Sequence, residues 1–123
     1  MYSVSVLDSF SSAHFLRGYK GKCENLHGHN WKVSLSIQSK RLDKRGMVLD
    51  FKDLKVMLNE ITSDLDHCCL NDHTFFKKVN PTSENIAAYI YKCVKNKIKA
   101  KNISGIEVSV WETDTSCATY KGK

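Results

Sequence analysis

Long hydrophobic runs, proline and low-complexity segments are almost absent from this chain of 123 residues, which contains one proline. No apolar run approaches the roughly 20 residues of a membrane-spanning helix, so we expect no membrane association. The first ten residues have neither the basic segment nor the apolar core of a secretory signal, and we therefore expect a cytoplasmic protein. Because no linker-like segment interrupts the chain, its length predicts a single domain over residues 1–123.

The cysteine pattern does not suit a disulfide framework. Five cysteines, an odd number, stand at positions 23, 68, 69, 93 and 117, and two adjacent cysteines are poorly placed to cross-link a fold. We therefore expect free thiols, of which one or two serve a function. A Gly-x-Gly-x-x-Gly motif is also missing, so nothing in the sequence predicts a bound nicotinamide dinucleotide.

The charge is positive but dispersed. Nineteen Lys and Arg residues against thirteen Asp and Glu residues give a formal net charge of +6. Such a charge suits a nucleic acid, a membrane surface or an anionic small molecule. The lysines do not gather into the single basic stripe of a nucleic-acid-binding face, so we expect mostly solvated lysines and no nucleic-acid partner. An anionic, phosphate-bearing substrate is the functional interpretation that remains.

Two-residue alternation predicts four strands. Their apolar residues are Tyr2, Val4, Val6 and Phe10 within 2–10; Trp31, Val33, Leu35 and Ile37; Ile106, Val108 and Val110; and Ala118 and Tyr120. Helical spacing predicts two helices between the second and third of these strands. Their apolar stripes are Phe51, Leu54, Met57, Leu58, Ile61 and Leu65, and Ile86, Ile90, Val94 and Ile98.

The helix starts carry capping residues. Asp50 is placed to cap the first helix, and Thr82 or Ser83 follows Pro81 at the start of the second. The resulting order is strand, strand, helix, helix, strand, strand. This order predicts an α+β fold in which two helices cover one side of an antiparallel sheet.

Three histidines in the first thirty residues predict a metal site. His27 and His29 share the parity of the apolar residues that follow them, so both rings project from the buried face if the strand is already extended there. An antiparallel neighbouring strand can bring His14 beside His29. Imidazole is the usual nitrogen ligand of zinc, and three such ligands leave a fourth position open for catalysis. The alternative for the HGH element alone is a pair of hydrogen-bonded histidines without metal.

Two further residues add chemistry to this pattern. Cys23 lies four residues before His27 and offers a thiol that can move protons; its alternative role is that of a fourth zinc ligand. Glu112 continues the apolar parity of its strand, so its carboxylate must be paired or serve a ligand. The alternative for Glu112 is a carboxylate exposed at the strand end.

Five ordered motifs resemble the 6-pyruvoyl-tetrahydropterin synthase family across residues 11–122. They are SSAHFL, C-x3-HGHNW, LDH at 65–67, PTSEN at 81–85 and WET at 111–113. The three-residue spacer between Cys23 and HGH is similar to that of the bacterial 6-carboxy-tetrahydropterin synthases of queuosine biosynthesis, whereas the pyruvoyl enzymes typically have a longer one. The resemblance implies a tunnelling fold of ββααββ subunits that closes into a barrel, usually a homohexamer built as a dimer of trimers.

The resemblance also implies residue roles. The Zn2+ ligands would be His14, His27 and His29. The proton-transfer residues would be Cys23 as a thiolate base, with Asp66 and His67 as a relay contributed across a subunit interface. The pterin-binding residues would be Glu112, which anchors the ring, and Thr82 and Glu84, whose alternative is a purely structural role at a helix start. His73 is expected to be solvated, and Cys68 and Cys69 stand where related enzymes often carry polar or basic residues.

The implied activity is that of a zinc-dependent lyase. Such an enzyme would convert 7,8-dihydroneopterin triphosphate to 6-carboxy-5,6,7,8-tetrahydropterin with release of acetaldehyde and triphosphate. A 6-pyruvoyl-tetrahydropterin synthase, which eliminates triphosphate without cleaving the side chain, is the nearest alternative. A non-catalytic pterin- or zinc-binding module is a second one, although a binder needs no Cys23, Asp66 and His67. A nucleic-acid-binding zinc domain is a third, but it would require a closed site with cysteine ligands.

Overall fold

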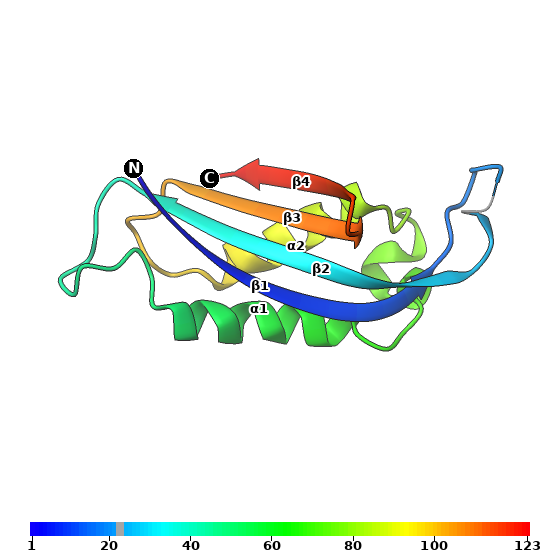
Figure 1. The fold of residues 1–123 in the computed structure, drawn as a ribbon, viewed down its shortest axis with the longest axis horizontal. Coiled ribbons are helices and arrows are strands. Elements are labelled where there is room, and N and C mark those ends of the chain that lie inside the picture. Colours follow the sequence, from blue (N-terminus) through cyan, green and yellow to red (C-terminus); the bar gives the residue numbers. More distant parts are fainter. Residues whose placement is uncertain (22–23) are drawn as a thin grey trace.

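The computed structural model describes residues 1–21 and 24–123, and its regular elements follow the order ββααββ (Figure 1). The elements are β1 (Tyr2–His14), β2 (His27–Ser39), α1 (Phe51–Leu65), η2 (Leu70–Asp72), η3 (Thr74–Lys77), α2 (Ser83–Lys97), β3 (Gly105–Thr113) and β4 (Ser116–Gly122). The α+β prediction is confirmed. The short 3-10 turns η2 and η3 are additions that the periodicity of the sequence does not indicate.

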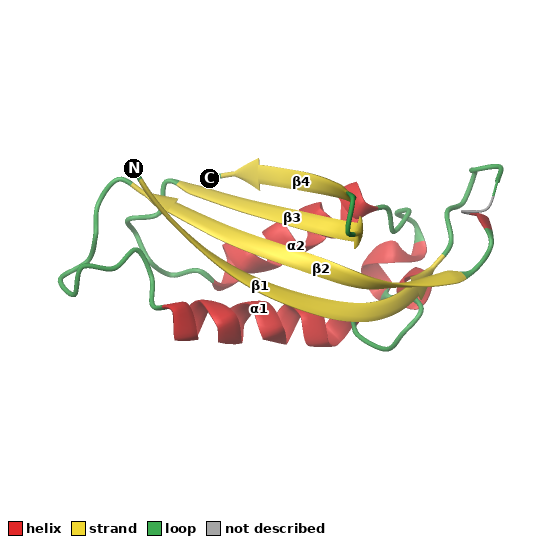
Figure 2. Ribbon diagram, in the orientation of Figure 1, coloured by secondary structure: helices red, strands yellow, loops and turns green. Residues whose placement is uncertain are grey.

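The four strands form one antiparallel sheet in the order β1-β2-β3-β4. Both helices lie on the same face of this sheet, with α1 along β1 and α2 along β3 and β4 (Figure 2). The termini lie near each other at one end of the molecule, and the loop that joins β1 to β2 lies at the other (Figure 1). In the described part of the chain, no helix has the length and apolar character needed to cross a membrane.

The core fills the space between the sheet and the helices. Trp31 and Phe10 are directly paired on β2 and β1, and their buried rings stack with centroids 5.9 Å apart. Leu58 of α1 and Ile90 of α2 are fully buried in the same cluster. Burial of each such large side chain stabilises the fold by about 1.5–3 kcal/mol. This packing holds the inner face of β1 and β2 rigidly against the helices.

Tyr2, Phe51 and Tyr120 of the predicted apolar faces are exposed. The Tyr2 side chain is 51% exposed and that of Phe51 is 54% exposed, although both share the parity or spacing of buried neighbours. Tyr2 is the first residue of β1 and Phe51 is the first residue of α1. At its other end β1 extends beyond the predicted boundary at residue 10 and runs to His14.

The predicted helix caps are present. The Asp50 side chain accepts a hydrogen bond of 2.8 Å from the Lys52 amide, and the Thr82 hydroxyl accepts one of 3.1 Å from the Asn85 amide. Thr82, rather than Ser83, is therefore the cap of α2. Capping satisfies amide groups that the helix itself leaves without an acceptor.

Replacing Thr82 by alanine is expected to lower the free energy of unfolding by about 1 kcal/mol, because one amide of the first turn of α2 loses its acceptor. Urea denaturation followed by circular dichroism measures this loss. Ser83→Ala is the matched control and should change stability by less than about 0.5 kcal/mol. Equal effects of the two substitutions would show that the cap contributes nothing specific.

The prediction that His73 is solvated is wrong. Its side chain is only 15% exposed, and its Nε2 lies 2.9 Å from Asp64 Oδ2. Its Nδ1 accepts a hydrogen bond from the Phe75 amide at the start of η3. Tyr89 of α2 packs against the same ring, and burial raises the pKa of the Tyr89 hydroxyl. His73 therefore joins α1, η3 and α2, a role that only the tertiary structure reveals.

Candidate metal centre

The first two strands bring three histidines to one end of the inner face of the sheet. His14, the last residue of β1, pairs with His27, the first residue of β2, and Ser12 pairs with His29. The sequence placed His14 beside His29, so the actual register differs from that expectation by two residues. All three rings nevertheless meet, with centroid separations of 4.6 to 5.3 Å.

Trp31 supports this cluster from the core side. Its buried indole packs edge-on against His14 and His29, with centroids 4.9 and 5.2 Å apart. The indole Nε1 also donates a hydrogen bond of 3.2 Å to the backbone carbonyl of Ser12. Since a fully buried ring has little freedom to move, Trp31 restricts the orientations of both imidazoles.

Two histidines have fixed tautomers. His14 Nδ1 lies 2.8 Å from the Pro81 carbonyl oxygen, and His27 Nδ1 lies 2.7 Å from that of Asn25. A carbonyl only accepts, so each neutral ring carries its hydrogen on Nδ1 and has a bare lone pair on Nε2. Metal-binding histidines usually make this type of second contact, which orients the ring.

The bare nitrogens face each other. His14 Nε2 and His27 Nε2 are 3.0 Å apart, and with both hydrogens on Nδ1 no hydrogen bond can join them. Two lone pairs at this distance repel unless a cation lies between them. Burial lowers the pKa of His14, which favours the neutral form that a metal requires.

His29 contributes a third nitrogen. Its Nε2 is buried and has no hydrogen-bond partner among the described residues, although it lies 2.7 Å from Glu112 Oε1. No hydrogen bond joins these two atoms. A buried polar nitrogen without a partner is rare in folded proteins. This nitrogen and those of His14 and His27 therefore fit a bound cation.

Glu112 completes the group. Its Oε1 is 3.6 Å from His14 Nε2 and 3.9 Å from His27 Nε2, so the carboxylate lies against all three rings. One donor atom from each of the four residues falls within 4.8 Å of the others. A tetrahedral ion with bonds of about 2.0–2.1 Å separates its ligands by about 3.4 Å. The donor set of His14, His27, His29 and Glu112 can therefore hold a divalent metal ion.

Two other predicted site residues lie at the start of α2. Thr82 caps α2 and Glu84 lies in the first turn of that helix, while Pro81 supplies the carbonyl for His14. Every residue has a backbone carbonyl, so the sequence does not indicate that the one of Pro81 contacts His14. Cys23, the predicted base, lies outside the described residues.

Two asparagines that the sequence analysis did not select fix the chain just after His14. The Asn71 side chain accepts from the Phe15 amide and donates to the Phe15 carbonyl, both at 3.0 Å. Asn80 makes the same pair of bonds with Arg17, both at 2.9 Å. A side-chain amide offers a donor and an acceptor side by side. Each asparagine therefore bonds both main-chain groups of one residue, as the backbone of a neighbouring strand would. They hold the path of the chain that leaves the histidine cluster.

Asp66 and His67 form a pair beside the outer edge of β1, where residues 66–69 hydrogen-bond to residues 11–13. Asp66 Oδ2 is 2.7 Å from His67 Nδ1, and Asp66 Oδ1 accepts a hydrogen bond of 2.8 Å from the Ser11 amide. These two contacts, that from Ser11 first, lower the pKa of Asp66. His67 has a left-handed backbone conformation with φ of 53°, and its side chain is 83% exposed. The aspartate orients the ring so that Nε2 faces solvent, an arrangement suited to proton transfer.

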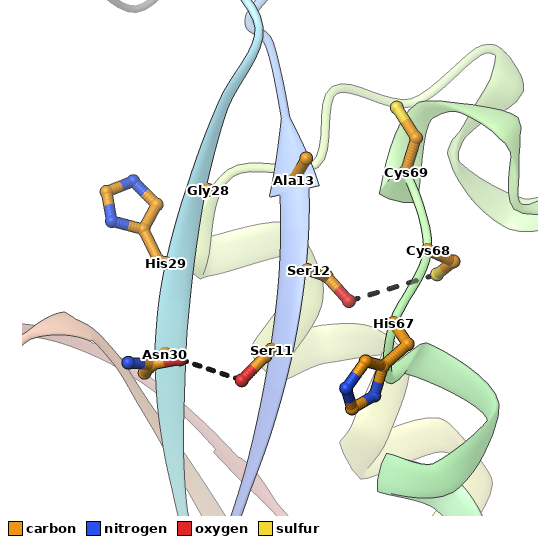
Figure 3. A pocket seen from close by; sticks show the side chains of 9 residues that line it. All are labelled: Ser11, Ser12, Ala13, Gly28, His29, Asn30, His67, Cys68 and Cys69. Atoms are coloured by element: carbon orange, nitrogen blue, oxygen red, sulfur yellow. Dashed lines mark hydrogen bonds between the residues drawn. The ribbon is translucent and has the colours of Figure 1, made fainter.

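The Asp66–His67 pair and the histidine cluster are separated by β1 and β2. An open depression of about 500 Å3 is lined by residues 11–13, 28–30 and 67–69. Figure 3 shows the His29 ring beyond β2 and the His67 ring beyond β1, with both strands between them. Cys68 and Cys69 follow His67 along the β1 edge, where Ala13 donates to the Cys68 carbonyl at 3.0 Å. Within one chain, therefore, His67 is separated from the His29 ring by both strands and is not a member of the group formed by His14, His27, His29 and Glu112.

Comparison with known proteins identifies relatives over nearly the whole chain. The chain is 33% identical over 143 residues to the 6-carboxy-5,6,7,8-tetrahydropterin synthase of Haemophilus influenzae, covering 98% of this chain and 99% of that protein. It is 40% identical over 118 residues to the synthase of the same name from Synechocystis, covering 91% and 87% of the two chains.

The fold agrees with these sequence relationships. The structure of 6-pyruvoyl tetrahydropterin synthase from Caenorhabditis elegans superposes with a TM-score of 0.87 at 31% identity, covering 99% of this chain and 96% of that one. The sequence model of the family described as 6-pyruvoyl tetrahydropterin synthase matches residues 3–123. The chain has the tunnelling fold and belongs to the 6-pyruvoyl tetrahydropterin synthase family.

Proposed function

We propose that this protein is a zinc-dependent lyase that converts 7,8-dihydroneopterin triphosphate to 6-carboxy-5,6,7,8-tetrahydropterin, releasing acetaldehyde and triphosphate, as a step of queuosine biosynthesis. The observation that carries the proposal is the convergence of three imidazole Nε2 atoms, two of them bare and 3.0 Å apart. The names of the bacterial relatives support the carboxy product. The three-residue spacer after Cys23 supports it as well.

His14, His27 and His29 are the proposed zinc ligands. A tetrahedral ion with nitrogen ligands and an accessible fourth position is typical of catalytic zinc. Bound zinc would act as a Lewis acid that lowers the pKa of the substrate hydroxyls and polarises a developing carbonyl. Trp31 and the carbonyls of Pro81 and Asn25 hold the three rings in the orientation that this requires.

Glu112 is the proposed anchor of the pterin ring. Its carboxylate can accept two hydrogen bonds from the ring amide and the exocyclic amine, which fixes the orientation of a planar heterocycle. Its side chain is 31% exposed beside the histidines, so a ligand can reach it. Thr82 and Glu84, at the start of α2, are proposed to lie at the margin of the same site.

Cys23, Asp66 and His67 are the proposed proton carriers. The Cys23 thiolate takes a proton from the pterin side chain, and positive charge near the thiol favours the thiolate form. Asp66 keeps a proton on His67 Nδ1 and leaves Nε2 free to accept or donate another. Because β1 and β2 lie between His67 and the His29 ring of the same chain (Figure 3), we propose that His67 serves the site of a neighbouring copy.

The sheet edges support such an assembly. β1 and β4 are the two edge strands, and each has one side without a strand neighbour in the described part of the molecule. Unpaired main-chain groups along an edge favour pairing with another chain. We propose that copies join edge to edge into a barrel, and that two trimeric barrels stack into a homohexamer with sites at subunit interfaces.

A triphosphate substrate is consistent with the positive net charge of the chain. The formal net charge of +6 raises the capture rate of a polyanion. Arg17 lies three residues after His14, and its buried Nη1 finds no hydrogen-bond acceptor in the residues that the structure describes. A phosphate oxygen is a suitable acceptor for a guanidinium N–H group.

Product analysis tests the proposed function. Zinc-loaded protein incubated with 7,8-dihydroneopterin triphosphate should yield 6-carboxy-5,6,7,8-tetrahydropterin by mass spectrometry, with acetaldehyde and triphosphate in equal amounts. The C. elegans relative is named a pyruvoyl synthase, and this second candidate predicts triphosphate release with the carbon side chain retained. Failure to consume the substrate at all would favour the third candidate, a non-catalytic binding module.

A further inference from the structure

Cys68 and Cys69 are adjacent free thiols that directly follow the Asp66–His67 pair. Both side chains are half-buried and line the open depression of about 500 Å3 together with His67. The proposed reaction uses neither thiol. Accessible cysteines with a second thiol close by are the usual targets of reversible oxidation. The pair is therefore a candidate site of chemical modification beside the relay.

The two thiols have different surroundings. Cys68 packs against the core, and its Sγ donates a hydrogen bond of 3.3 Å to the Leu65 carbonyl. Cys69 Sγ makes only a long contact of 4.0 Å with Asn71 Oδ1. Because a reagent reaches a loosely held thiol more easily, we expect Cys69 to react first and Cys68 to follow.

Main-chain hydrogen bonds hold this segment against β1. The His67 amide donates to the Ser11 carbonyl at 2.6 Å, and the Ala13 amide donates to the Cys68 carbonyl at 3.0 Å. Cys69 bridges to Ala13 and has an extended backbone, with φ of -90° and ψ of 117°. Adjacent side chains of an extended chain lie on opposite sides. Figure 3 accordingly shows the two sulfur atoms pointing in different directions.

A disulfide between the two residues is incompatible with this backbone. The Cβ atoms of a disulfide lie about 3.5–4.5 Å apart, so the peptide group that joins the two cysteines must rotate to bring both side chains to one side. That peptide group carries the carbonyl to which Ala13 donates, and its rotation breaks this hydrogen bond. Formation of the disulfide therefore releases residues 67–69 from β1 and moves His67.

Such a disulfide is also easily reduced. Cα atoms on either side of a trans peptide are about 3.8 Å apart, which is below the usual range of about 4.4–6.8 Å between disulfide-linked residues. Strain of this kind makes a disulfide more reducible. Oxidation at these positions is therefore suited to a reversible modification and not to a structural cross-link.

We propose that Cys68 and Cys69 are a modification site for low-molecular-weight disulfides, at which the two thiols close reversibly into a disulfide and displace His67. The Cys69 thiolate attacks the reagent and releases one thiol, and the Cys68 thiolate then attacks the Cys69 sulfur and releases a second. The protein thiols lose two electrons and two protons, which the released thiols carry away. The modification rests on the placement of the cysteines, whereas its effect on turnover rests on the proposed role of His67.

Peptide mapping after treatment with oxidised glutathione tests the modification. Zinc-loaded wild type, Cys68→Ser and Cys117→Ser are treated, alkylated and digested with trypsin; the peptide 56–77 contains Cys68 and Cys69 and no other cysteine. In wild type this peptide should lose two hydrogens and resist alkylation, and a phosphine reductant should restore both thiols. Cys68→Ser should stop at a glutathione adduct on Cys69. Cys117→Ser removes an exposed thiol on β4 and should behave like wild type.

Hydrogen exchange tests the displacement of the segment without any turnover. The amides of residues 11–14 should exchange at least about tenfold faster in oxidised than in reduced wild type, because the Ala13 amide loses its acceptor. In the double variant Cys68→Ser, Cys69→Ser, oxidised glutathione should leave this exchange unchanged. Circular dichroism verifies that the double variant is folded.

An activity assay on the same samples tests the consequence for the reaction. Oxidation should lower the turnover of zinc-loaded wild type by about 10²-fold, the usual contribution of a positioned proton carrier, and reduction should restore it. The zinc content should not change, because β1 and β2 separate His67 from the His29 ring. The double variant should keep its turnover in the presence of oxidised glutathione.

Each alternative result would overturn a stated part of the proposal. A glutathione adduct on wild-type Cys69 without ring closure would reject the disulfide between adjacent residues, and so would unmodified thiols in the peptide 56–77. Ring closure without faster exchange of residues 11–14 would reject the displacement. Ring closure and faster exchange with undiminished turnover would keep the modification site and contradict the proposed role of His67. Equal inactivation of the double variant would assign the loss of activity to another thiol.

Discussion

His27→Ala is expected to abolish both metal binding and turnover, because it removes one of the three imidazole nitrogens that converge at the end of β1 and β2. Loss of an outer-sphere partner costs metal affinity about 10- to 100-fold, and loss of a direct ligand should cost more. Metal analysis after purification, beside an assay of product formation, measures both quantities. His67→Ala is the matched control, since it deletes an exposed imidazole outside the cluster and should retain the metal.

The companion variant Cys23→Ala separates ligation from proton transfer. It should retain stoichiometric zinc but lose turnover by about 10²- to 10⁴-fold, which is the usual contribution of a positioned base. Equal loss of zinc in Cys23→Ala and His27→Ala would make the thiol a ligand and reject its role as a base. Retention of zinc by His27→Ala would instead remove His27 from the metal centre.

Mixed oligomers of two inactive variants are expected to regain activity. If His67 of one copy serves the metal centre of its neighbour, a copy with His67→Ala can supply the metal side of a site and a copy with His27→Ala can supply the relay. Random assembly of equal amounts leaves about a quarter of the sites intact. Co-expression of differently tagged chains, tandem purification and an activity assay measure this recovery.

The same experiment distinguishes a His67 that serves the neighbouring copy from a His67 that acts within its own chain. Each variant alone should have negligible activity, and a mixture of two preparations of His27→Ala should remain inactive. Tandem purification establishes that both chains occupy one assembly. An inactive mixed assembly would show that the relay acts within its own chain, despite the two strands that separate His67 from His29 in Figure 3.

Much of the fold and the histidine cluster could be predicted from local patterns. Alternation and helical spacing reflect which residues must be buried, and burial fixes the faces of strands and helices. His27 and His29 were placed on the inner face by parity alone, and that face is where they lie. The register of β1 against β2 could not be fixed in this way. A shift of two residues preserves every inward-facing side chain, so the pattern does not distinguish His27 from His29 as the partner of His14.

The contacts that complete the site depend on chain segments far apart in sequence. The Pro81 carbonyl that orients His14 lies 67 residues away, and a backbone carbonyl has no sequence signal. Strand alternation places Glu112 on the inner face, but its contact with all three rings depends on how β3 lies beside β2 in the folded sheet. Asp66 and His67 are adjacent, but their side chains meet only because the Ser11 amide holds the carboxylate in place. The half-buried position of His73 has the same origin, since Asp64 of α1 and Tyr89 of α2 both contact its ring.

The most direct test of the central claim is the location of zinc in a crystal of the metal-loaded protein, from anomalous scattering on both sides of the zinc absorption edge. One peak per chain is expected about 2.0–2.1 Å from Nε2 of His14, His27 and His29. A peak at any other place, or none among the three imidazoles at full metal loading, would contradict the claim that these histidines form the metal centre.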